Sequence, residues 1–291
     1  MAPLNEGFFI VTTKLLRHST ARLTGLIATL ALTAGLTAAP ASADPGPSYV
    51  GLGDSYAAGI GGGQYLVAPG LVPAPCAQTG AAYSTYLGGL NLACAGATTA
   101  DVSNNAVAAA HLLKDSTHVT VTVGANDIDA AAATAQCAAL VLTPACKAAL
   151  FNSLALKLPK LPAKIKSMVA VIKSKAPRAK IVITGYPRLF TLNSSMSPEQ
   201  KSTANTINAA VDLLNATIAV SAFASRAQYL SVTQQFTNHG LGSAEPWIVG
   251  VPPFCLSATC ASAEQPGDVF HPTETGHISG YALTIKAALA R

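Results

Sequence analysis

Five short apolar runs, separated by longer polar and alanine-rich stretches, predict a buried β-sheet. The clearest is residues 118–123, where β-branched residues alternate before Gly124. Similar runs cover residues 49–52, 90–94, 180–184 and 228–232. Runs of this length and composition are typical of strands that are covered on both faces.

The stretches between these runs carry the apolar spacing of helices. Residues 161–175 place apolar side chains on one helical face, and Ser197 with Pro198 opens a long helix that runs to about residue 226. Strands that alternate with helices of ten or more residues predict one α/β domain, a three-layer α/β/α fold around a five-stranded parallel sheet. Further helices are expected at residues 83–87 (a single turn), 101–113, 130–149 (broken near Pro144) and 273–289.

Two segments rich in Pro and Gly interrupt this alternation. We expect residues 66–80 to be irregular and exposed, tethered by Cys76. Residues 236–267 hold Trp247 and the last two cysteines. Irregular segments of that length are usually functional or held by crosslinks.

The N-terminus has the order of a secretory signal peptide. Basic residues precede an uncharged apolar stretch at residues 23–36, and Ala41-Ser42-Ala43 offers a cleavage site. We therefore expect a leader at residues 1–43, a single domain at residues 44–291 and a secreted protein. The leader holds three of the 18 Lys and Arg and one of the 13 Asp and Glu, which leaves 15 basic and 12 acidic residues. This weak, unclustered positive charge argues against a nucleic-acid partner.

All six cysteines follow the leader, which predicts three disulfides in an oxidising compartment. Six cysteines allow fifteen pairings, and the sequence leaves them open. We expect nearest neighbours to pair, because this closes three short loops: Cys76–Cys94, Cys137–Cys146 and Cys255–Cys260. None of the six has metal-ligand spacing with a histidine, so zinc is not expected.

Polar residues follow the first three predicted strands where each strand ends. Asp54 and Ser55 follow the first, Gly96 the second and Asn126 the third. Because the carboxyl ends of parallel strands share one edge of a sheet, we expect these residues to meet there. A serine at a helix start is commonly a cap. It can equally be a nucleophile, and His271, just before the last helix, is a candidate base.

These residues follow, in order, the blocks of one enzyme family. Gly53-Asp54-Ser55, then Gly96, then Gly124-x-Asn126-Asp127, then Asp268-x-x-His271 resemble the SGNH (GDSL-type) esterases and lipases. The resemblance covers roughly residues 49–278 and looks closest to the secreted, three-disulfide actinobacterial branch. It implies a flavodoxin-like fold with five parallel strands and hydrolysis of carboxylic esters without a cofactor.

The resemblance also implies a role for each residue. Ser55 attacks the acyl carbonyl, His271 takes and returns the proton, and Asp268 orients the imidazole. The oxyanion hole is formed by the backbone N–H groups of Ser55 and Gly96 and the side-chain amide of Asn126. Some members of the branch hold the histidine with a main-chain carbonyl, but the presence of Asp268 favours a triad. A Tyr, not the family's Leu, follows Ser55.

The same residues also have structural interpretations. Asn126 and Asp127 are typical turn residues, Asp268 could cap the last helix, and His271 could pack in a loop. His277 is a rival base, but it falls inside a helical run and lacks the preceding Asp-x-x pattern. Asp127 with Asp129 is weak evidence for a metal pair, and we expect no metal.

The substrate is the open question. Apolar residues of the two irregular segments (Leu71, Val72, Ile248, Val251 and Phe254) favour an acyl pocket, and so a lipase or fatty-acyl esterase. They could equally do no more than cover the sheet. A small-acyl carbohydrate esterase fits the same catalytic core, and a non-catalytic secreted binding module would keep the fold. We expect a monomer that acts on small-molecule or lipid esters. Transient contact with a lipid surface is compatible with this, although no helix carries Lys and Arg along one face.

Overall fold

The computed structural model describes residues 48–67, 76–137, 139–250, 265 and 267–290. Contacts divide the chain into two units, Met1–Ser42 and Ala43–Arg291, and all described residues belong to the second. The predicted leader, residues 1–43, therefore lies outside the described residues.

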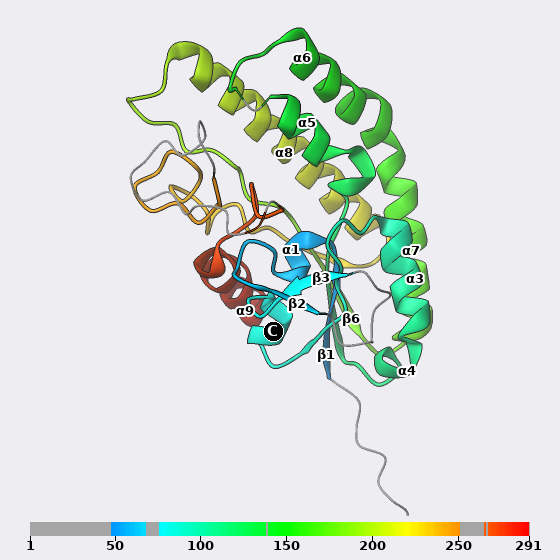
Figure 1. Ribbon diagram of the computed structural model, residues 1–291. Helices are drawn as coiled ribbons and strands as arrows, with labels where there is room; N and C mark the ends of the chain where they lie inside the picture. Colours follow the sequence, from blue (N-terminus) through cyan, green and yellow to red (C-terminus); the bar gives the residue numbers. More distant parts are fainter. Residues whose placement is uncertain (1–47, 68–75, 138, 251–264, 266, 291) are drawn as a thin grey trace, which may run out of the picture. The chain divides into compact units, whose positions relative to one another are not determined.

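The five predicted strands form one parallel sheet, which confirms the expected fold class (Figure 1). Neighbouring strands run in the order β4-β1-β5-β6-β7. The register pairs Gly53 with Thr122 and Thr122 with Thr184, so three central strands end together. β4 and β5 lie on opposite sides of β1, so the strand order reverses at β1. In open α/β sheets, ligands bind in a crevice at the carboxyl ends of the strands at such a point. The strands are β1 (Tyr49–Gly53), β4 (Leu90–Asn91), β5 (His118–Thr122), β6 (Lys180–Thr184) and β7 (Gln228–Leu230).

Helices cover both faces of this sheet. Figure 1 shows α3 and α7 on one side of the strands and α9 on the other. On the first side α3 packs against α7, and α7 packs against α8. The helices are α1 (Ser55–Ala58), α2 (Tyr83–Tyr86), α3 (Thr99–Ala108), α4 (Ala110–Leu113), α5 (Ala130–Gln136), α6 (Pro144–Phe151), α7 (Leu161–Lys175), α8 (Pro198–Ala224) and α9 (Leu283–Leu289).

The long helix that begins at Pro198 forms as expected. The helix α8 is long and apolar enough to cross a membrane by length and composition alone. It packs against α7 and β7 and buries Ile207, Leu214 and Ile218, so it is a core helix of this domain. Between the predicted helices at residues 130–149 and 161–175, the helical segments η2 (Asn152–Lys157) and η3 (Leu158–Lys160) connect α6 to α7 without a break.

The expectation that residues 66–80 are irregular is wrong at both ends of that segment, and the expectation that they are exposed holds at Leu66 but is wrong at Gln78 and Thr79. An antiparallel hairpin pairs β2 (Tyr65–Val67) with β3 (Ala77–Thr79). Polar side chains of β3 are buried: Gln78 is 5% exposed, and its amide donates to the carbonyl of Ala93 at 2.6 Å. Buried polar residues give no hydrophobic alternation, which is why the pattern does not predict this hairpin.

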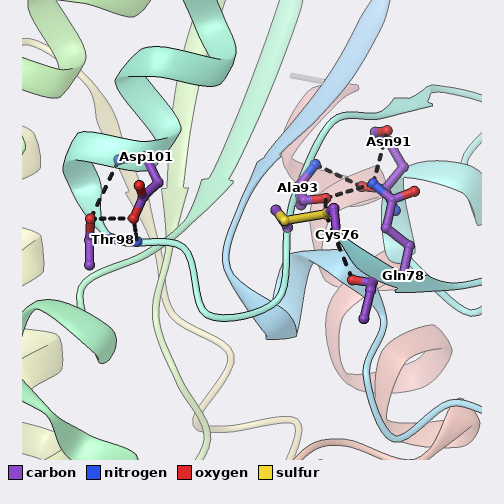
Figure 2. Close-up of a disulfide and its surroundings, with 8 residues drawn as sticks. Cys76, Gln78, Asn91, Ala93, Thr98 and Asp101 are labelled. Atoms are coloured by element: carbon purple, nitrogen blue, oxygen red, sulfur yellow. Dashed lines mark hydrogen bonds between the residues drawn. A yellow bond between two sulfur atoms is a disulfide. The ribbon is translucent and has the colours of Figure 1, made fainter. Parts of the chain in front are cut away.

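The disulfide Cys76–Cys94 ties this hairpin to the segment that follows β4 (Figure 2). A second disulfide joins Cys137 to Cys146, between α5 and α6. Both pairs join nearest neighbours, as expected from the sequence. The predicted pair Cys255–Cys260 lies outside the described residues.

Candidate active site

Ser55 lies at the first position of α1, where the chain leaves β1. Asp54 takes the capping role, since its Oδ1 accepts a hydrogen bond from the N–H of Tyr56 at 3.0 Å. The N–H of Asp54 donates to the carbonyl of Thr122 at the end of β5 (2.8 Å). Gly53 has a φ of +134°, a conformation that L side chains rarely adopt. Because Asp54 caps the helix, the Ser55 hydroxyl is available to another partner.

That partner is His271. Ser55 Oγ and His271 Nε2 are 2.7 Å apart, although the residues are 216 positions apart in sequence. Backbone pairing holds the histidine segment: Val249 N–H donates to the His271 carbonyl (2.8 Å), and Phe270 N–H donates to the Val249 carbonyl (2.9 Å). The structure therefore brings the predicted nucleophile and base together at the carboxyl edge of the sheet.

Burial dominates the protonation of His271. It lowers the pKa of the imidazole to about 4, while the backbone carbonyl groups of Asp268, Val269 and Gly267 and the Asp268 carboxylate raise it. The imidazole is therefore uncharged at neutral pH, which is the state that a general base needs.

Asp268 is close to His271 but makes no side-chain hydrogen bond with it. The carboxylate is 2% exposed, and its Oδ2 accepts from the N–H of Gln265 at 2.8 Å. Among the described residues, neither Asp268 Oδ1 nor His271 Nδ1 has a hydrogen-bond partner. The two residues meet instead through the main chain, where the His271 N–H donates to the Asp268 carbonyl at 2.9 Å. The role of Asp268 in a triad stays a prediction.

Gly96 and Asn126 line the same pocket as Ser55. The segment that leads to Gly96 is held by a bond from Cys94 N–H to the Gly53 carbonyl (2.9 Å). Asn126 opens the turn η1 (Asn126–Ile128), and its Nδ2 donates to the Ala97 carbonyl at 3.1 Å. A side-chain amide carries two N–H groups, so one remains for a ligand. The three predicted oxyanion-hole residues are thus neighbours in the fold.

The carboxylates of Asp127 and Asp129 are both engaged by protein groups. Asp127 accepts from the N–H (2.9 Å) and hydroxyl (2.8 Å) of Thr99 and from Lys164 Nζ (3.1 Å), and Asp129 pairs with Lys157. Among the described residues, no group of three or more His, Cys, Asp or Glu could hold a metal ion. Asp127 instead fastens the start of α3, just after Gly96, to the loop that carries Asn126.

His277, the rival base, is a core residue. It is fully buried, its Nε2 lies 2.9 Å from the carbonyl oxygen of Ile60, and burial lowers its pKa to about 4. It forms no part of the pocket wall around Ser55.

Two tyrosines near Ser55 were not predicted to act in the site. The Tyr56 hydroxyl donates to the Phe270 carbonyl at 2.6 Å. The Tyr186 hydroxyl donates to Asp54 Oδ2 at 2.5 Å and accepts from the N–H of Ala125 at 3.2 Å. Burial raises the pKa of Asp54 to about 7, although the hydrogen bond from Tyr186 lowers it. The sequence offers no stronger signal for Tyr186 than a tyrosine just past the end of a strand.

An apolar pocket of about 740 Å³ adjoins Ser55 and His271. Its wall comes from α1, α5, α8, the β2–β3 hairpin, the segments after β4, β5 and β6, and the segment before His271. The predicted wall differs from the observed one: Ile248 is fully buried, pairs with Pro272 and does not line the pocket. The predicted Leu71, Val72, Val251 and Phe254 lie outside the described residues. The lining includes Ala130, Thr134, Leu189, Val211, Leu214 and Phe270.

Comparisons with known proteins agree with this geometry. A family model described as the GDSL-like Lipase/Acylhydrolase family matches residues 52–277. Lipase 1 of Streptomyces coelicolor is 30% identical over 283 residues, which cover 92% of this chain and 98% of that protein. A lipase of Streptomyces rimosus is 31% identical over 277 residues, which cover 94% of this chain and 98% of the relative.

Solved structures show the same likeness. The extracellular lipase from Streptomyces rimosus matches with a TM-score of 0.69 and 29% identity, over 82% of this chain and 98% of that one. Phospholipase A1 from Streptomyces albidoflavus matches with a TM-score of 0.68 and 29% identity. The match covers 83% of this chain and 99% of that one. The family match spans the segments that carry Ser55, Gly96, Asn126 and His271, and the chain therefore belongs to the GDSL-like lipase and acylhydrolase family of carboxylic ester hydrolases.

Proposed function

We propose that the protein is a secreted lipase or fatty-acyl esterase that works through an acyl-Ser55 intermediate. The observation that carries this proposal is the 2.7 Å between Ser55 Oγ and His271 Nε2 beside an apolar pocket. A neutral imidazole at hydrogen-bond distance activates a serine hydroxyl. An adjoining apolar pocket suits an acyl chain.

In the first half of the reaction, Ser55 Oγ attacks the acyl carbonyl carbon while His271 Nε2 takes the hydroxyl proton. The carbonyl oxygen becomes negatively charged, and the N–H groups of Ser55, Gly96 and Asn126 stabilise it. His271 then gives its proton to the leaving alcohol, and the C–O bond breaks. A water molecule attacks the acyl-serine in the same way, with His271 again as base, and releases the carboxylic acid.

Asp268 is proposed to stabilise the imidazolium that forms on His271. Its support is electrostatic, since the carboxylate raises the pKa of His271. The Nδ1–H of the neutral base also needs an acceptor, and Oδ1 of Asp268 has no hydrogen-bond partner among the described residues.

Asp268→Asn tests this role because it removes the charge and keeps the size. We expect a lower kcat and an acid limb of kcat/KM that moves to lower pH. An unchanged pH profile would assign the orientation of His271 to the backbone carbonyl groups of residues 267–269.

The proposed substrate class follows from the pocket wall. Apolar side chains (alanine, leucine, valine, isoleucine, proline and phenylalanine) make up most of it, which favours a fatty-acyl chain over an acetyl group on a sugar. The relatives named lipase and phospholipase A1 agree with this class. Rates on p-nitrophenyl esters from acetyl to palmitoyl separate the two possibilities, because a small-acyl carbohydrate esterase would be fastest on acetyl.

Secretion is proposed on three grounds: the leader pattern of residues 1–43, the two disulfides among the described residues, and the relative named as an extracellular lipase. We propose that the secreted protein is a monomer that contacts lipid surfaces transiently. Mass spectrometry of protein from the culture medium tests the leader, with a mature chain expected to begin at Asp44. A chain that stays inside the cell, or that keeps residues 1–43, would contradict it.

Covalent labelling tests the proposed nucleophile. The protein is treated with an organophosphonate ester, digested and analysed by mass spectrometry, beside Ser55→Ala and a control variant, Ser195→Ala, at an exposed serine outside the pocket. We expect wild type and the Ser195 variant to carry one label at Ser55 and the Ser55 variant to carry none. A folded wild-type protein that takes no label would refute the proposed function.

A further inference from the structure

We propose that Tyr56 and Tyr186 are positioning residues that hold the segments of Ser55, His271 and Asn126 in register. The inference rests on the proposed function, since it concerns the alignment of the same catalytic groups. It adds two residues whose hydroxyl groups act through neighbouring backbone and through Asp54, and which need not contact the reacting atoms.

Tyr56 connects the nucleophile to the base. It follows Ser55 directly in α1, and its hydroxyl donates to the carbonyl of Phe270, the residue before His271, at 2.6 Å. Each end of this bond is thus one residue from a reacting side chain. The Tyr56 ring also lies 5.1 Å from the His271 ring, centre to centre. A change in this contact would move Ser55 Oγ relative to His271 Nε2.

The backbone at Phe270 needs such a contact. Its φ of +67° is in the left-handed region, which a non-glycine residue adopts at a cost in free energy. Such strained residues persist when surrounding bonds over-determine them. Here the N–H of Phe270 donates to the Val249 carbonyl, and its carbonyl accepts from Tyr56. The tyrosine therefore helps to keep the conformation that aims His271 at Ser55.

Tyr186 extends the connection to the segment after β5 that carries Ala125 and Asn126, here called the oxyanion loop. Its hydroxyl donates to Asp54 Oδ2 at 2.5 Å and accepts from the N–H of Ala125, the residue before Asn126, at 3.2 Å. Asp54 Oδ1 accepts from the N–H of Tyr56, which joins the two tyrosines into one network. The Tyr56 and Tyr186 rings pack edge to face at 5.0 Å.

All three side chains of this network are buried. Tyr56 is 9%, Tyr186 is 3% and Asp54 is 1% exposed. Hydrogen bonds shielded from water are costly to leave unmade, so the network has a defined geometry. Burial also raises the pKa of Tyr56 and that of Tyr186 well above the usual value. Both hydroxyl groups therefore stay protonated at neutral pH and remain donors.

Tyr83 provides a matched control. It is fully buried, its hydroxyl is 2.8 Å from Thr122 Oγ1, and its ring stacks on Tyr281 at 5.5 Å. Tyr83 does not line the pocket. Tyr83→Phe therefore removes a buried hydroxyl of the same core whose hydrogen bond goes to a side chain of β5, and not to the backbone next to Ser55, His271 or Asn126 or to Asp54.

The test compares Tyr56→Phe, Tyr186→Phe and Tyr83→Phe with wild type on p-nitrophenyl butyrate, with melting temperature and the rate of organophosphonate labelling measured on the same samples. We expect kcat to fall about 10- to 100-fold in the Tyr56 and Tyr186 variants, because small misplacements of catalytic groups have effects of that size. KM stays within about twofold, since both substitutions keep the aromatic rings with which Tyr56 and Tyr186 line the pocket. Labelling of Ser55 slows in the Tyr56 variant, and Tyr83→Phe keeps the kcat of wild type.

Values of kcat in the Tyr56 and Tyr186 variants that match those of Tyr83→Phe would overturn the proposal. A loss confined to KM would overturn it as well. If Tyr56→Phe does not fold, Tyr186→Phe decides by the same two criteria. A wild-type protein without esterase activity or labelling would instead refute the proposed function, and the two failures are therefore distinguishable.

Discussion

A tryptophan at position 134 should shorten the acyl pocket and change the chain-length profile. The helix α5 lines the pocket with Ala130 and Thr134, and Ala130 N–H is bonded to the Ala125 carbonyl beside the oxyanion loop (2.9 Å). Thr134 lies one helical turn, about 6 Å, further along. An indole there occupies space that the distal part of an acyl chain would use, while the space next to Ser55 stays open.

The magnitude follows from burial of the chain. Each methylene that leaves water contributes about 0.8 kcal/mol, or about fourfold in kcat/KM. From butyryl to octanoyl, four methylenes amount to about 3 kcal/mol, so the wild-type protein should gain up to about 200-fold. In Thr134→Trp we expect this gain to fall to about tenfold or less, with the butyryl rate little changed.

The assay measures kcat/KM on soluble p-nitrophenyl esters from acetyl to octanoyl. The matched control is Ala132→Trp, because Ala132 is exposed on the same helix and does not line the pocket. Equal slopes for Thr134→Trp and wild type would refute the assignment of this wall to the acyl chain. A wild-type protein that gains nothing beyond acetyl would point to a small-acyl esterase.

Three shorter predictions follow from the site. The pKa of His271, lowered to about 4 by burial, keeps the base neutral as the pH falls, so the acid limb of kcat/KM should lie well below 6.5; a limb at 6.5 or above contradicts this reasoning. Asn126→Ala removes one oxyanion donor and should lower kcat about 10²–10³-fold, whereas an unchanged kcat would exclude it from the oxyanion hole. The lost bond to the Ala97 carbonyl should lower the free energy of unfolding by about 1 kcal/mol. Replacing Cys76 and Cys94 by serine removes a disulfide between residues 18 positions apart, and should lower the free energy of unfolding, measured in urea, by about 3 kcal/mol. A loss below about 1 kcal/mol would mean that the loop is ordered without the disulfide.

The sheet could be predicted because its strands are buried on both faces and therefore read as apolar runs. Residues 118–122 and 180–184 are clear examples, and both runs are strands with almost every residue buried. The β2–β3 hairpin is different. Thr79 and Gln78 are polar but buried, and their side chains bond to the carbonyl groups of Gly59 and Ala93. Hydrophobic pattern carries no information about such contacts.

Two further features could not be predicted from the sequence, for other reasons. They are the residues that line the pocket and the group that contacts the His271 side of the turn. The alanines of α5 that line the pocket look like those that do not, since a helix shows its faces only after it docks. The spacing Asp268-x-x-His271 places two residues in one turn, but it leaves the direction of the carboxylate undetermined. In this structure the backbone of the turn approaches the histidine, while Asp268 Oδ2 binds the Gln265 N–H.

The order of the strands explains why part of the site was predictable and part was not. Ser55 follows β1, and Gly96 and Asn126 follow β4 and β5, which flank β1. These three residues must meet once the sheet forms, because parallel neighbours end at one edge. Among the described residues, His271 follows no strand, and its segment is held beside Ser55 by backbone bonds to Val249 and by the bond from Tyr56 to the neighbouring Phe270. The alignment of base and nucleophile therefore depends on individual side-chain contacts, and single hydroxyl deletions at the tyrosines should affect it while the sheet remains intact.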